Sequence, residues 1–349
     1  MIAAKQKEEF YQAFVSKNAD YEGVFFVGVM STGIFCRPTC PARKPKLENC
    51  TFFACAQDAL RASYRPCKRC NPLELPESMS RLVQALMEAV ENDPTKRWSV
   101  RDLEKHGADA STVRRQFKKR FGMTFAAYAR ARRMDIASQQ MHEGERVIEA
   151  QLNAGYDSAS GFREAFAKTM GAPPTQAKAQ LAVLKASWID TPLGPMMAVA
   201  DETGLFLLSF ANSTLLERQI EYLRSQNSAV VLPGTNAVLE KVEAELTAYF
   251  AGTLHVFETP LHLGGTPFQV RAWEALMAIP YGQARSYKEQ AACIQEGSAT
   301  RAVAAANAAN LLAIVIPCHR VINSSGETGG YAGGVVREKW LLAHETRHA

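Results

Sequence analysis

The sequence predicts a multidomain chain that combines α/β and all-α parts, and three observations indicate this. Two close cysteine pairs lie within the first 75 residues, and a basic pattern of two short helices occurs twice between residues 98 and 171. Strand-type segments between residues 188 and 210 are followed, from Pro267, by helical sequence. With 349 residues, 47% of them hydrophobic, the chain is long enough to build two or three domains.

Turn-rich joints and an uneven charge separate these parts. Residues 71–78 and 171–175 are rich in proline, glycine and polar residues, and a new pattern begins after Leu184. Residues 1–75 carry 11 basic and 7 acidic groups, residues 76–183 carry 17 and 13, and residues 184–349 carry 12 and 15. The net charges are therefore +4, +4 and −3, so the positive excess lies in the first two parts, and the third is expected to contact nucleic acid through a local face.

The first part is predicted to bind a metal ion. Cys36 and Cys40 are separated by three residues, and Cys67 and Cys70 by two, which suits tetrahedral zinc held by four thiolates. The alternative is a pair of disulfides in a secreted domain. The first nine residues have no hydrophobic signal region, so we expect a reducing compartment and a metal site. Three further cysteines lack partners at ligand spacing and are expected to be buried: Cys50, Cys55 and Cys293.

The sequence around these ligands, Thr-Gly-Ile-Phe-Cys-Arg-Pro-Thr-Cys at 32–40 and Arg-Pro-Cys-Lys-Arg-Cys at 65–70, resembles the methyl-phosphotriester sensor of the Ada adaptive-response proteins. The resemblance implies an α+β module in which Cys36 is both a zinc ligand and a methyl acceptor. DNA contacts in this module are expected from Thr32, Arg43, Arg65 and Arg69. A purely structural zinc ribbon is the alternative.

The charge of such a site suggests a switch. Four thiolates around one zinc ion carry a formal charge of about −2, which keeps the sulfurs ionised at neutral pH. Methylation of Cys36 would remove one negative charge. A less negative site is repelled less by the DNA backbone, so alkylation is expected to raise the affinity for DNA.

The second part reads as two helix-turn-helix units. Residues 98–103 begin a first helix, and residues 110–122 form a basic second helix with Ser111 as its cap and Gly122 as its stop. Its apolar face consists of Val113, Phe117 and Phe121. Residues 147–150 and 158–171 repeat the arrangement.

Two such units in tandem resemble the AraC-type DNA-binding domain. Candidate groove contacts are Arg114, Arg115 and Arg163. The chain departs from the family pattern at Glu104, where a small alanine is usual, and at Phe125, where proline is usual; these departures bear on affinity or target sequence more than on the fold. The alternative is a basic, solvated helix pair with no role in nucleic-acid binding.

The third part carries the most informative motif of the chain, Ile-Pro-Cys-His-Arg-Val at 316–321, which follows strand-type residues 311–316. Cys318 is a candidate nucleophile. On an extended strand neighbouring side chains point to opposite faces, so His319 is expected to act through a water molecule or at the strand's end. This disfavours a papain-like hydrolase.

The motif resembles the active-site signature of the O6-alkylguanine-DNA alkyltransferases, and the resemblance covers residues 184–349. It implies an α/β subdomain at 184–262 and a winged-helix-like catalytic subdomain at 263–349, after a sensor at 1–75 and a double helix-turn-helix at 80–181. Family features lie at matching offsets: an asparagine hinge, an arginine finger, two active-site tyrosines and a buried glutamate, here Asn310, Arg301, Tyr287, Tyr331 and Glu345.

The resemblance implies a relay of Cys318, a water molecule, His319 and Glu345 that produces the thiolate. A thioether has no good leaving group, so each molecule would react once. The target base must leave the duplex; Arg301 would fill the vacated stack and Tyr287 would donate a hydrogen bond to the base. Without the motif, residues 301–310 read as a tightly packed core helix and Tyr287 as an ordinary half-buried aromatic.

Together these features predict a cytoplasmic, single-turnover methylated-DNA–protein-cysteine methyltransferase that also activates transcription of alkylation-response genes once Cys36 is methylated. We expect one zinc ion, double-stranded DNA and RNA polymerase as partners, and a monomer. No apolar run approaches the ~20 residues that span a bilayer. Two alternatives are a zinc-dependent AraC-type regulator with a C-terminal sensor domain, and a Cys-His hydrolase, which would turn over.

Overall fold

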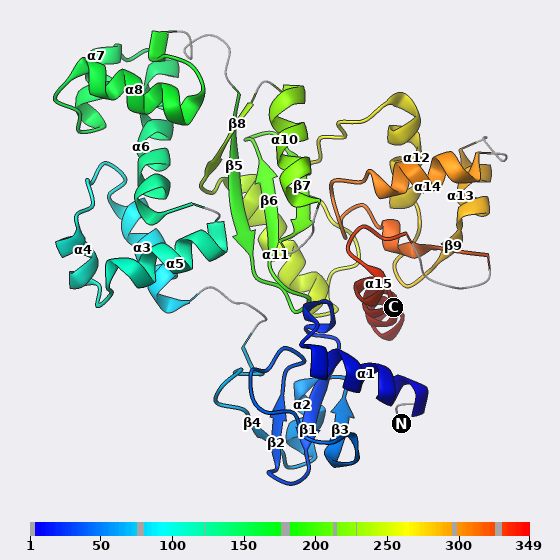
Figure 1. The fold of residues 1–349 in the computed structure, drawn as a ribbon. Helices are drawn as coiled ribbons and strands as arrows, with labels where there is room; N and C mark the ends of the chain where they lie inside the picture. Colours follow the sequence, from blue (N-terminus) through cyan, green and yellow to red (C-terminus); the bar gives the residue numbers. More distant parts are fainter. Residues whose placement is uncertain are drawn as a thin grey trace.

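The structure is a computed structural model that describes residues 4–74, 80–121, 123–175, 182–211, 215–227, 229–294, 299–324 and 330–349, with the side chains of residues 4, 5, 119 and 120 excepted. Its described parts form an N-terminal α+β module, a helical region, a four-stranded sheet with helices and a C-terminal helical region (Figure 1). This agrees with the predicted fold class.

The N-terminal module is a small sheet with helices packed on it. The strand order is β3-β1-β2-β4, and β1 pairs with β2 and β3 in antiparallel fashion. Its core is aromatic: Phe10 stacks on Phe25 at a centroid distance of 4.3 Å, and both contact Phe52. Its elements are α1 (Ala4–Ser16), η1 (Ala19–Tyr21), β1 (Phe26–Val29), β2 (Ile34–Cys36), η2 (Leu47–Asn49), β3 (Cys50–Phe53), α2 (Ala56–Arg61) and β4 (Arg65–Pro66).

The helical region contains the two predicted helix-turn-helix units, joined by the long helix α6 (Figure 1). Ser99 and Asp102 form a capping box at the start of α4, and Ser158 caps α8. The elements are α3 (Arg81–Asn92), α4 (Val100–Lys105), α5 (Ala110–Phe121), α6 (Phe125–His142), α7 (Val147–Asn153) and α8 (Ala159–Met170).

The predicted cap of α5 is wrong. The carboxylate of Asp109, and not the hydroxyl of Ser111, accepts the backbone N–H groups of Ser111 and Thr112, each at 2.9 Å. A carboxylate is the better acceptor at a helix N-terminus, because it also interacts favourably with the helix dipole. The predicted stop at Gly122 lies outside the described residues.

The third part is a sheet of order β7-β6-β5-β8, in which only β8 runs parallel to its neighbour. Helix α11 packs on one face of the sheet through Val238, Val242 and Leu246, and α10 covers the other through Leu216 and Leu223. The elements are β5 (Ala182–Ile189), β6 (Met196–Ala200), β7 (Leu205–Phe210), α10 (Leu216–Asn227), β8 (Ala229–Pro233) and α11 (Ala237–Phe250).

The C-terminal part is largely helical with a two-stranded parallel pair, β9 and β10. Trp273 anchors α12 on α14, since its indole N–H donates to the carbonyl of Ala306 at 2.8 Å. The elements are α12 (Pro267–Met277), β9 (Arg285–Ser286), α13 (Tyr287–Cys293), α14 (Thr300–Ala308), η3 (Cys318–Arg320), β10 (Val321–Ile322) and α15 (Val335–His348).

The predicted strand at 311–316 is also wrong. These residues form isolated bridges, and Ile314 has a left-handed backbone with φ of 72°. The side chain of Asn310 explains the turn, because its oxygen accepts from the N–H of Leu312 while its amide donates to the carbonyl of Ile316, both at 2.9 Å. Cys318 therefore begins a 3-10 helix at the end of a tight turn.

The helical region and the sheet share a buried seam. Asp135 on α6 is fully buried and is paired with Lys185 on β5 and, at 2.5 Å, with Arg132. Leu232 of β8 belongs to the same apolar cluster as Met134 and Phe166. Figure 1 shows α6 lying beside β8 and β5. Two regions with separate sequence patterns are thus joined through a common core.

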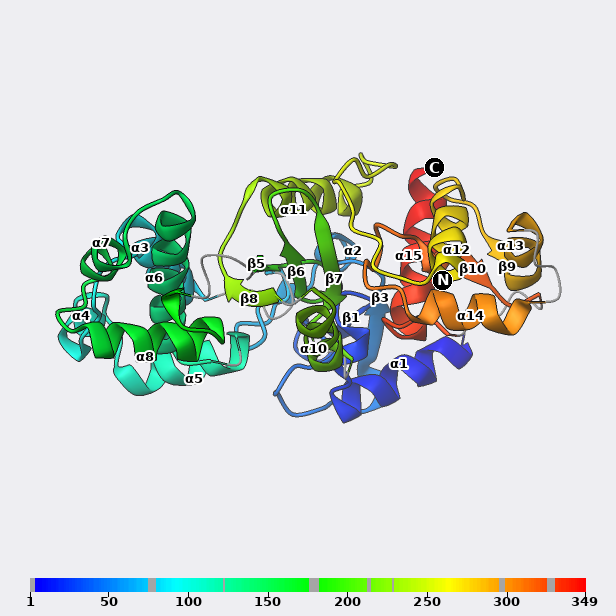
Figure 2. The same cartoon turned by 90° about the horizontal axis from the view of Figure 1, so that it is seen from above.

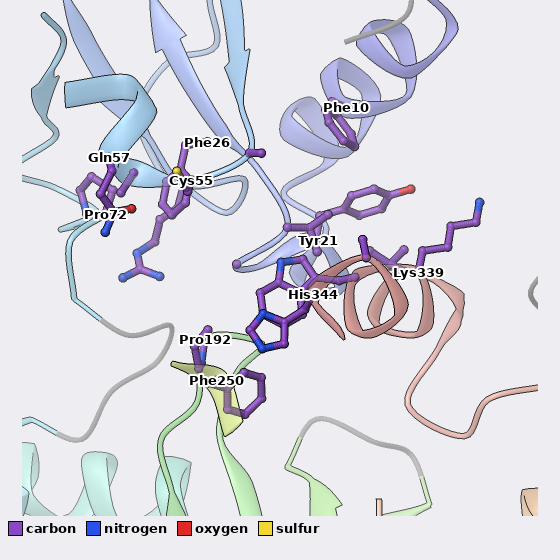
Figure 3. Close-up of a pocket in the computed structure, with 18 of the residues that line it drawn as sticks. Phe10, Tyr21, Phe26, Cys55, Gln57, Pro72, Pro192, Phe250, Lys339 and His344 are labelled. Carbon is purple, nitrogen blue, oxygen red and sulfur yellow. The ribbon is translucent and has the colours of Figure 1, made fainter. Parts of the chain in front are cut away.

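The N-terminal module contacts the C-terminal helix α15 through η1, and it also contacts the β5–β6 turn. A side chain at Gly23 would overlap the carbonyl oxygen of Pro192 in that turn, so the two backbones approach closely there. Beside this contact lies a cavity of about 740 Å³, lined by Tyr21 and Phe26 on one side and by Phe250 and His344 on the other (Figure 3). Figure 2 shows α1 near α15. No helix among the described residues is long and apolar enough to cross a lipid bilayer.

Candidate functional site

The four predicted ligands converge in the N-terminal module. The sulfur atoms of Cys36, Cys40, Cys67 and Cys70 all lie within 4.8 Å of one another. Cys36 ends β2, and the N–H of Cys67 donates to the carbonyl of Phe35 at 3.0 Å, so the β2–β4 pairing brings the two cysteine pairs together. The backbone thereby places four sulfurs around one point.

The electrostatics of the cluster favour a divalent cation. Hydrogen bonding with Cys40 and Cys70, followed by burial, raises the pKa of Cys36, whereas the hydrogen bonds of Cys36 and Cys70 lower the pKa of Cys40 to about 2. Four thiol groups this close together have to share protons. Zn²⁺ can replace those protons and bind all four sulfurs as thiolates. The four-cysteine site therefore fits zinc.

A buried ion pair supports the metal site from behind. The guanidinium of Arg37 lies 3.2 Å from Glu22, and both side chains are only 7% exposed. The backbone N–H of Arg37 donates to the sulfur of Cys70 at 3.4 Å, and Glu22 also accepts from Thr39. This pair was missed from the sequence, although Arg37 directly follows a ligand.

The expected DNA contacts of the module lie on its surface. Thr32 is in the β1–β2 turn and Arg65 in β4, next to each other, since the N–H of Arg65 donates to the carbonyl of Gly33. Arg43 and Arg69 are likewise exposed.

The three remaining cysteines differ: Cys50 is buried, Cys55 is partly exposed and Cys293 is exposed, so the expectation that all three are buried is wrong for two of them.

The second site surrounds Cys318, which is buried with 7% exposure. The side-chain amide of Asn310 donates to the sulfur at 3.2 Å. Burial raises the pKa of Cys318 to about 11, and the hydrogen bond from Asn310 opposes this rise. A group that takes the proton away is therefore needed for the thiolate to form at neutral pH.

Such a group lies next in the chain. The Nε2 atom of His319 is 2.8 Å from the carboxylate of Glu345, which fixes the other ring nitrogen, Nδ1, as a free acceptor. Among the described residues Nδ1 has no hydrogen-bond partner. Burial lowers the pKa of His319, so the ring is neutral near pH 7 and can accept a proton.

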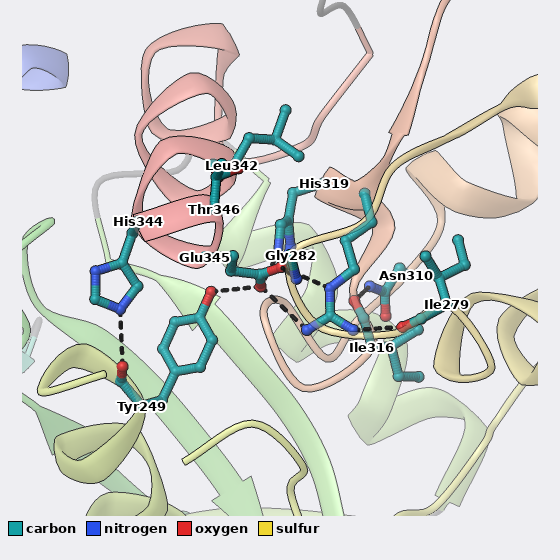
Figure 4. A network of polar contacts seen from close by, with 11 residues as sticks. Tyr249, Ile279, Gly282, Asn310, Ile316, His319, Leu342, His344, Glu345 and Thr346 are labelled. Atoms are coloured by element: carbon teal, nitrogen blue, oxygen red, sulfur yellow. Dashed lines mark hydrogen bonds and ion pairs between the residues drawn. The ribbon is translucent and has the colours of Figure 1, made fainter. Parts of the chain in front are cut away.

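Glu345 is the centre of a larger polar network (Figure 4). It accepts hydrogen bonds from Arg320 at 2.8 Å, from the hydroxyl of Tyr249 at 2.8 Å and from the N–H of Gly282 at 3.2 Å. Burial by itself would raise the pKa of Glu345, but the interactions with His319 and Arg320 lower it to about 2. The carboxylate is therefore ionised throughout the neutral range.

Sequence reasoning missed two side chains of this network. Arg320 stands within the Ile-Pro-Cys-His-Arg-Val motif, so its position was a usable signal. Tyr249 lies 96 residues from Glu345 on helix α11, and no local pattern pointed to it.

Both tyrosines expected in the site lie near Cys318, and the ring of Tyr331 is 6.1 Å from that of His319. Tyr331 is buried, and Tyr287, the first residue of α13, is half-buried, with burial raising the pKa of each hydroxyl. A Cβ atom at Gly330 would lie 3.0 Å from the hydroxyl of Tyr287, so the two approach closely. Arg301 is exposed at the start of α14.

Helix α14 has one face in the core and one in solvent. Val303, Ala306 and Asn307 are buried, and the exposed residues Ala302, Ala305 and Ala308 form a flat stripe beside Arg301. The helix is thus neither wholly in the core nor wholly exposed.

In the helical region, the three candidate groove contacts, Arg114, Arg115 and Arg163, are all exposed, on α5 and α8.

Comparison with curated proteins shows the family. The chain is 33% identical over 98% of its length to the "Bifunctional transcriptional activator/DNA repair enzyme Ada" of Escherichia coli, of which it covers 97%. The chain belongs to the Ada family.

Four family models match consecutive segments of this Ada-family chain. They are described as the metal binding domain of Ada (residues 9–73), a helix-turn-helix domain (104–180), the ribonuclease-like domain of 6-O-methylguanine DNA methyltransferase (184–263) and the DNA binding domain of the same enzyme (267–347).

Two further similarities concern the C-terminal half of the Ada-family chain. A "Methylated-DNA--protein-cysteine methyltransferase" of Salmonella typhimurium is 43% identical over 45% of this chain and 92% of its own length. The crystal structure of Mycobacterium tuberculosis OGT in complex with DNA is 39% identical, covers 48% of this chain and 95% of that one, and has a TM-score of 0.41.

Proposed function

We propose that Cys318 and Cys36 are the two alkyl acceptors of this Ada-family chain. The chain is a methylated-DNA–protein-cysteine methyltransferase that repairs DNA by transferring alkyl groups to cysteine, and it is also a DNA-binding transcriptional activator. The observation that carries the first assignment is the buried Cys318 sulfur, which accepts from Asn310 and is followed in the chain by the His319–Glu345 pair.

At Cys318 the thiol proton moves to Nδ1 of His319, through a bridging water molecule, while the Nε2–H of His319 continues to donate to the carboxylate of Glu345. The thiolate then attacks the alkyl carbon on the guanine O6. A sulfur–carbon bond forms as the carbon–oxygen bond breaks, and the electron pair stays with the guanine, which takes up a proton. The resulting thioether has no good leaving group, so the reaction stops after one turnover.

The target base must be outside the duplex to reach a buried sulfur, which costs a few kcal/mol. The exposed alanine stripe of α14 allows close approach to a groove, and Arg301 at its end would fill the vacated position in the base stack. The hydroxyl of Tyr287 would donate a hydrogen bond to the base as negative charge develops on it.

At the first site the four cysteines would hold zinc, which when bound keeps the coordinated sulfurs ionised and electron-rich. Cys36 takes the methyl group of a methyl phosphotriester; a sulfur–carbon bond replaces a carbon–oxygen bond, and the phosphate regains its negative charge. The exposed side chains of Thr32, Arg43, Arg65 and Arg69 would hold the backbone.

Four segments, 1–75, 80–181, 184–262 and 263–349, would act as separate domains with different roles. Methylation of Cys36 makes its site less negative and increases affinity for promoter DNA, which the helix-turn-helix units would read through Arg114, Arg115 and Arg163. Activation would then proceed through contact with RNA polymerase, with the chain acting as a monomer. Chromosomal DNA as substrate and four thiolates that need reducing conditions favour the cytoplasm.

Intact-mass spectrometry after incubation with methylated DNA tests the assignment, with peptide mapping to locate each methyl group. The unchanged protein should gain one methyl at Cys318 from O6-methylguanine and one at Cys36 from the phosphotriester. Cys318→Ala should lose the first and keep the second, Cys36→Ala the reverse, and Cys293→Ala should lose neither. More than one product released per Cys318 would indicate a hydrolase and overturn the proposal.

A further inference from the structure

A cluster of unpaired cations lies in the helical region, away from both cysteine sites. Arg97, Arg130, Arg133 and Lys168 line an open cavity of about 380 Å³. Its wall also contains Tyr156, whose ring lies 5.0 Å from the guanidinium of Arg97 and 5.9 Å from that of Arg133. Three separate segments, the stretch before α4, helix α6 and helix α8, therefore bring positive charge to one place.

The four cations outnumber the acidic groups of the cavity. Within the described ranges none of the four forms an ion pair, and Glu164 is the one carboxylate among the lining residues. The Nη1 of Arg133 donates to the carbonyl of Lys96 at 3.3 Å, but its Nε atom is buried and has no partner among the described residues. Burial, and then the charges of Arg97 and Arg130, lower the pKa of Arg133. An anion in the cavity could accept a hydrogen bond from the buried Nε–H group of Arg133 and would be attracted by the surrounding positive charge.

The cavity opens on the outer face of α8. Gly161, Glu164, Ala165 and Lys168 follow helical spacing and form one side of the helix. The opposite side, Phe162, Phe166 and Met170, is buried in the core. At Gly161 an added Cβ atom would lie 2.9 Å from the hydroxyl oxygen of Ser158 and 3.9 Å from the ring of Tyr156, so the chain is closely packed at this edge of the cavity. An occupant would therefore bridge the second helix-turn-helix unit and the segment that leads into the first.

We propose that the Arg97–Arg130–Arg133–Lys168 cluster binds a phosphate group, and that this group belongs to the DNA backbone. The inference rests on the proposed function for its partner, and it adds a contact that the helix-turn-helix pattern did not indicate. Guanidinium groups bind phosphate oxygens in bidentate fashion, and a phosphodiester has the single negative charge and compact shape that such a cavity accepts. The site would anchor the two units on the duplex without reading its sequence.

The test compares double variants of the full-length protein in duplex binding measured over a range of salt concentrations. In Arg97→Gln/Arg130→Gln both changed side chains are at least partly exposed, so the fold should persist. We expect about tenfold weaker binding at low salt for any duplex sequence, and a slope of log K against log salt that is smaller by about one. Arg81→Gln/Arg218→Gln removes the same charge from exposed positions elsewhere and should keep the slope.

A charge-preserving variant separates anion binding from packing on Tyr156. Arg97→Lys/Arg130→Lys should restore most of the salt slope, because lysine still binds phosphate as a point charge. If the glutamine and lysine pairs both bind and respond to salt like the Arg81/Arg218 control, the phosphate site does not exist.

A second arm distinguishes the backbone from a free phosphate compound. Calorimetric titration of the unchanged protein with ATP and with inorganic pyrophosphate should show no binding at this cluster. In practice, no binding signal should be present that disappears in Arg97→Gln/Arg130→Gln. Binding of that kind, with duplex affinity unchanged, would overturn the backbone assignment in favour of a free polyphosphate ligand. Methyl transfer to Cys318 from the free base should be normal in all variants; its failure in the unchanged protein would count against the proposed function and not against this site.

Discussion

The side-chain amide of Asn310 donates to the sulfur of Cys318 at 3.2 Å, and the same amide donates to the carbonyl of Ile316. One side chain thus fixes the turn that presents the cysteine and also stabilises the charged form of its sulfur. The two effects separate in experiment, because only the second changes the pH dependence of the reaction.

Asn310→Ala should therefore slow methyl transfer and move its pH profile upward. The hydrogen bond lowers the pKa of Cys318, so its loss leaves less thiolate at neutral pH. A hydrogen bond to a charged group contributes about 1.5–3 kcal/mol, which corresponds to a rate loss of roughly 10- to 150-fold. Single-turnover rates from pH 6 to about 10 would check this. A uniform loss at every pH would instead indicate that only the turn is disturbed.

Glu345→Gln should destabilise the folded protein and make its free energy of unfolding depend less on pH in the acid range. The pKa of Glu345 is lowered to about 2, compared with about 4.3 in an unfolded chain. The unfolded state thus binds more protons between these values, and the stability that Glu345 contributes is present above about pH 4 and is lost as pH falls towards 2. Leaving Arg320 without its carboxylate should cost about 3–5 kcal/mol at neutral pH. Urea unfolding at several pH values measures both effects.

Arg301→Ala should slow repair in duplex DNA by about 10- to 100-fold, because the side chain would act on the extruded base's vacant position and not on the sulfur. Reaction with the free methylated base should be unchanged. Arg347→Ala, which removes the same charge from an exposed site on α15, serves as the control. Equal slowing with duplex and free base would show that Arg301 is not a finger residue.

Cys40→Ala, Cys67→Ala and Cys70→Ala should each abolish zinc binding and unfold the N-terminal module, since small zinc modules depend on their metal for stability. Metal analysis and circular dichroism of the full chain would report both losses. Cys55→Ala, in the same module but outside the cluster, should retain the metal. Retention of stoichiometric zinc in the Cys40 variant would argue against a four-thiolate site.

Methylation of Cys36 should tighten promoter binding, and the gain should shrink as salt rises, because it comes from weaker repulsion of the DNA backbone. Electrophoretic mobility shifts with methylated and unmethylated protein at low and high salt would measure it. Equal affinity of the two forms at low salt would leave the zinc module as a repair site without regulatory output.

The sequence was most informative where chemistry requires fixed spacing. The two cysteine pairs predicted the metal cluster that Cys36, Cys40, Cys67 and Cys70 form. The periodic helices of both helix-turn-helix units also appear near their expected bounds.

It was least informative where one side chain reorganises the backbone. Residues 311–316 have strand-type composition, but the hydrogen bonds of Asn310 turn them into a compact loop. Contacts between distant segments, such as Tyr249 with Glu345, leave no local pattern at all. The seam between Asp135 and Lys185 was missed for the same reason.

The contact between Asp135 and Lys185 limits how easily evolution can separate the helix-turn-helix region from the alkyltransferase region. A helix-turn-helix region expressed without the sheet would have Asp135 without its partner Lys185. The apolar surface that Leu232 covers would be exposed to solvent. The same holds for the sheet taken alone. In relatives that carry only one half we therefore expect this surface to have changed, with an uncharged residue at the position of Asp135 or a polar residue at the position of Leu232.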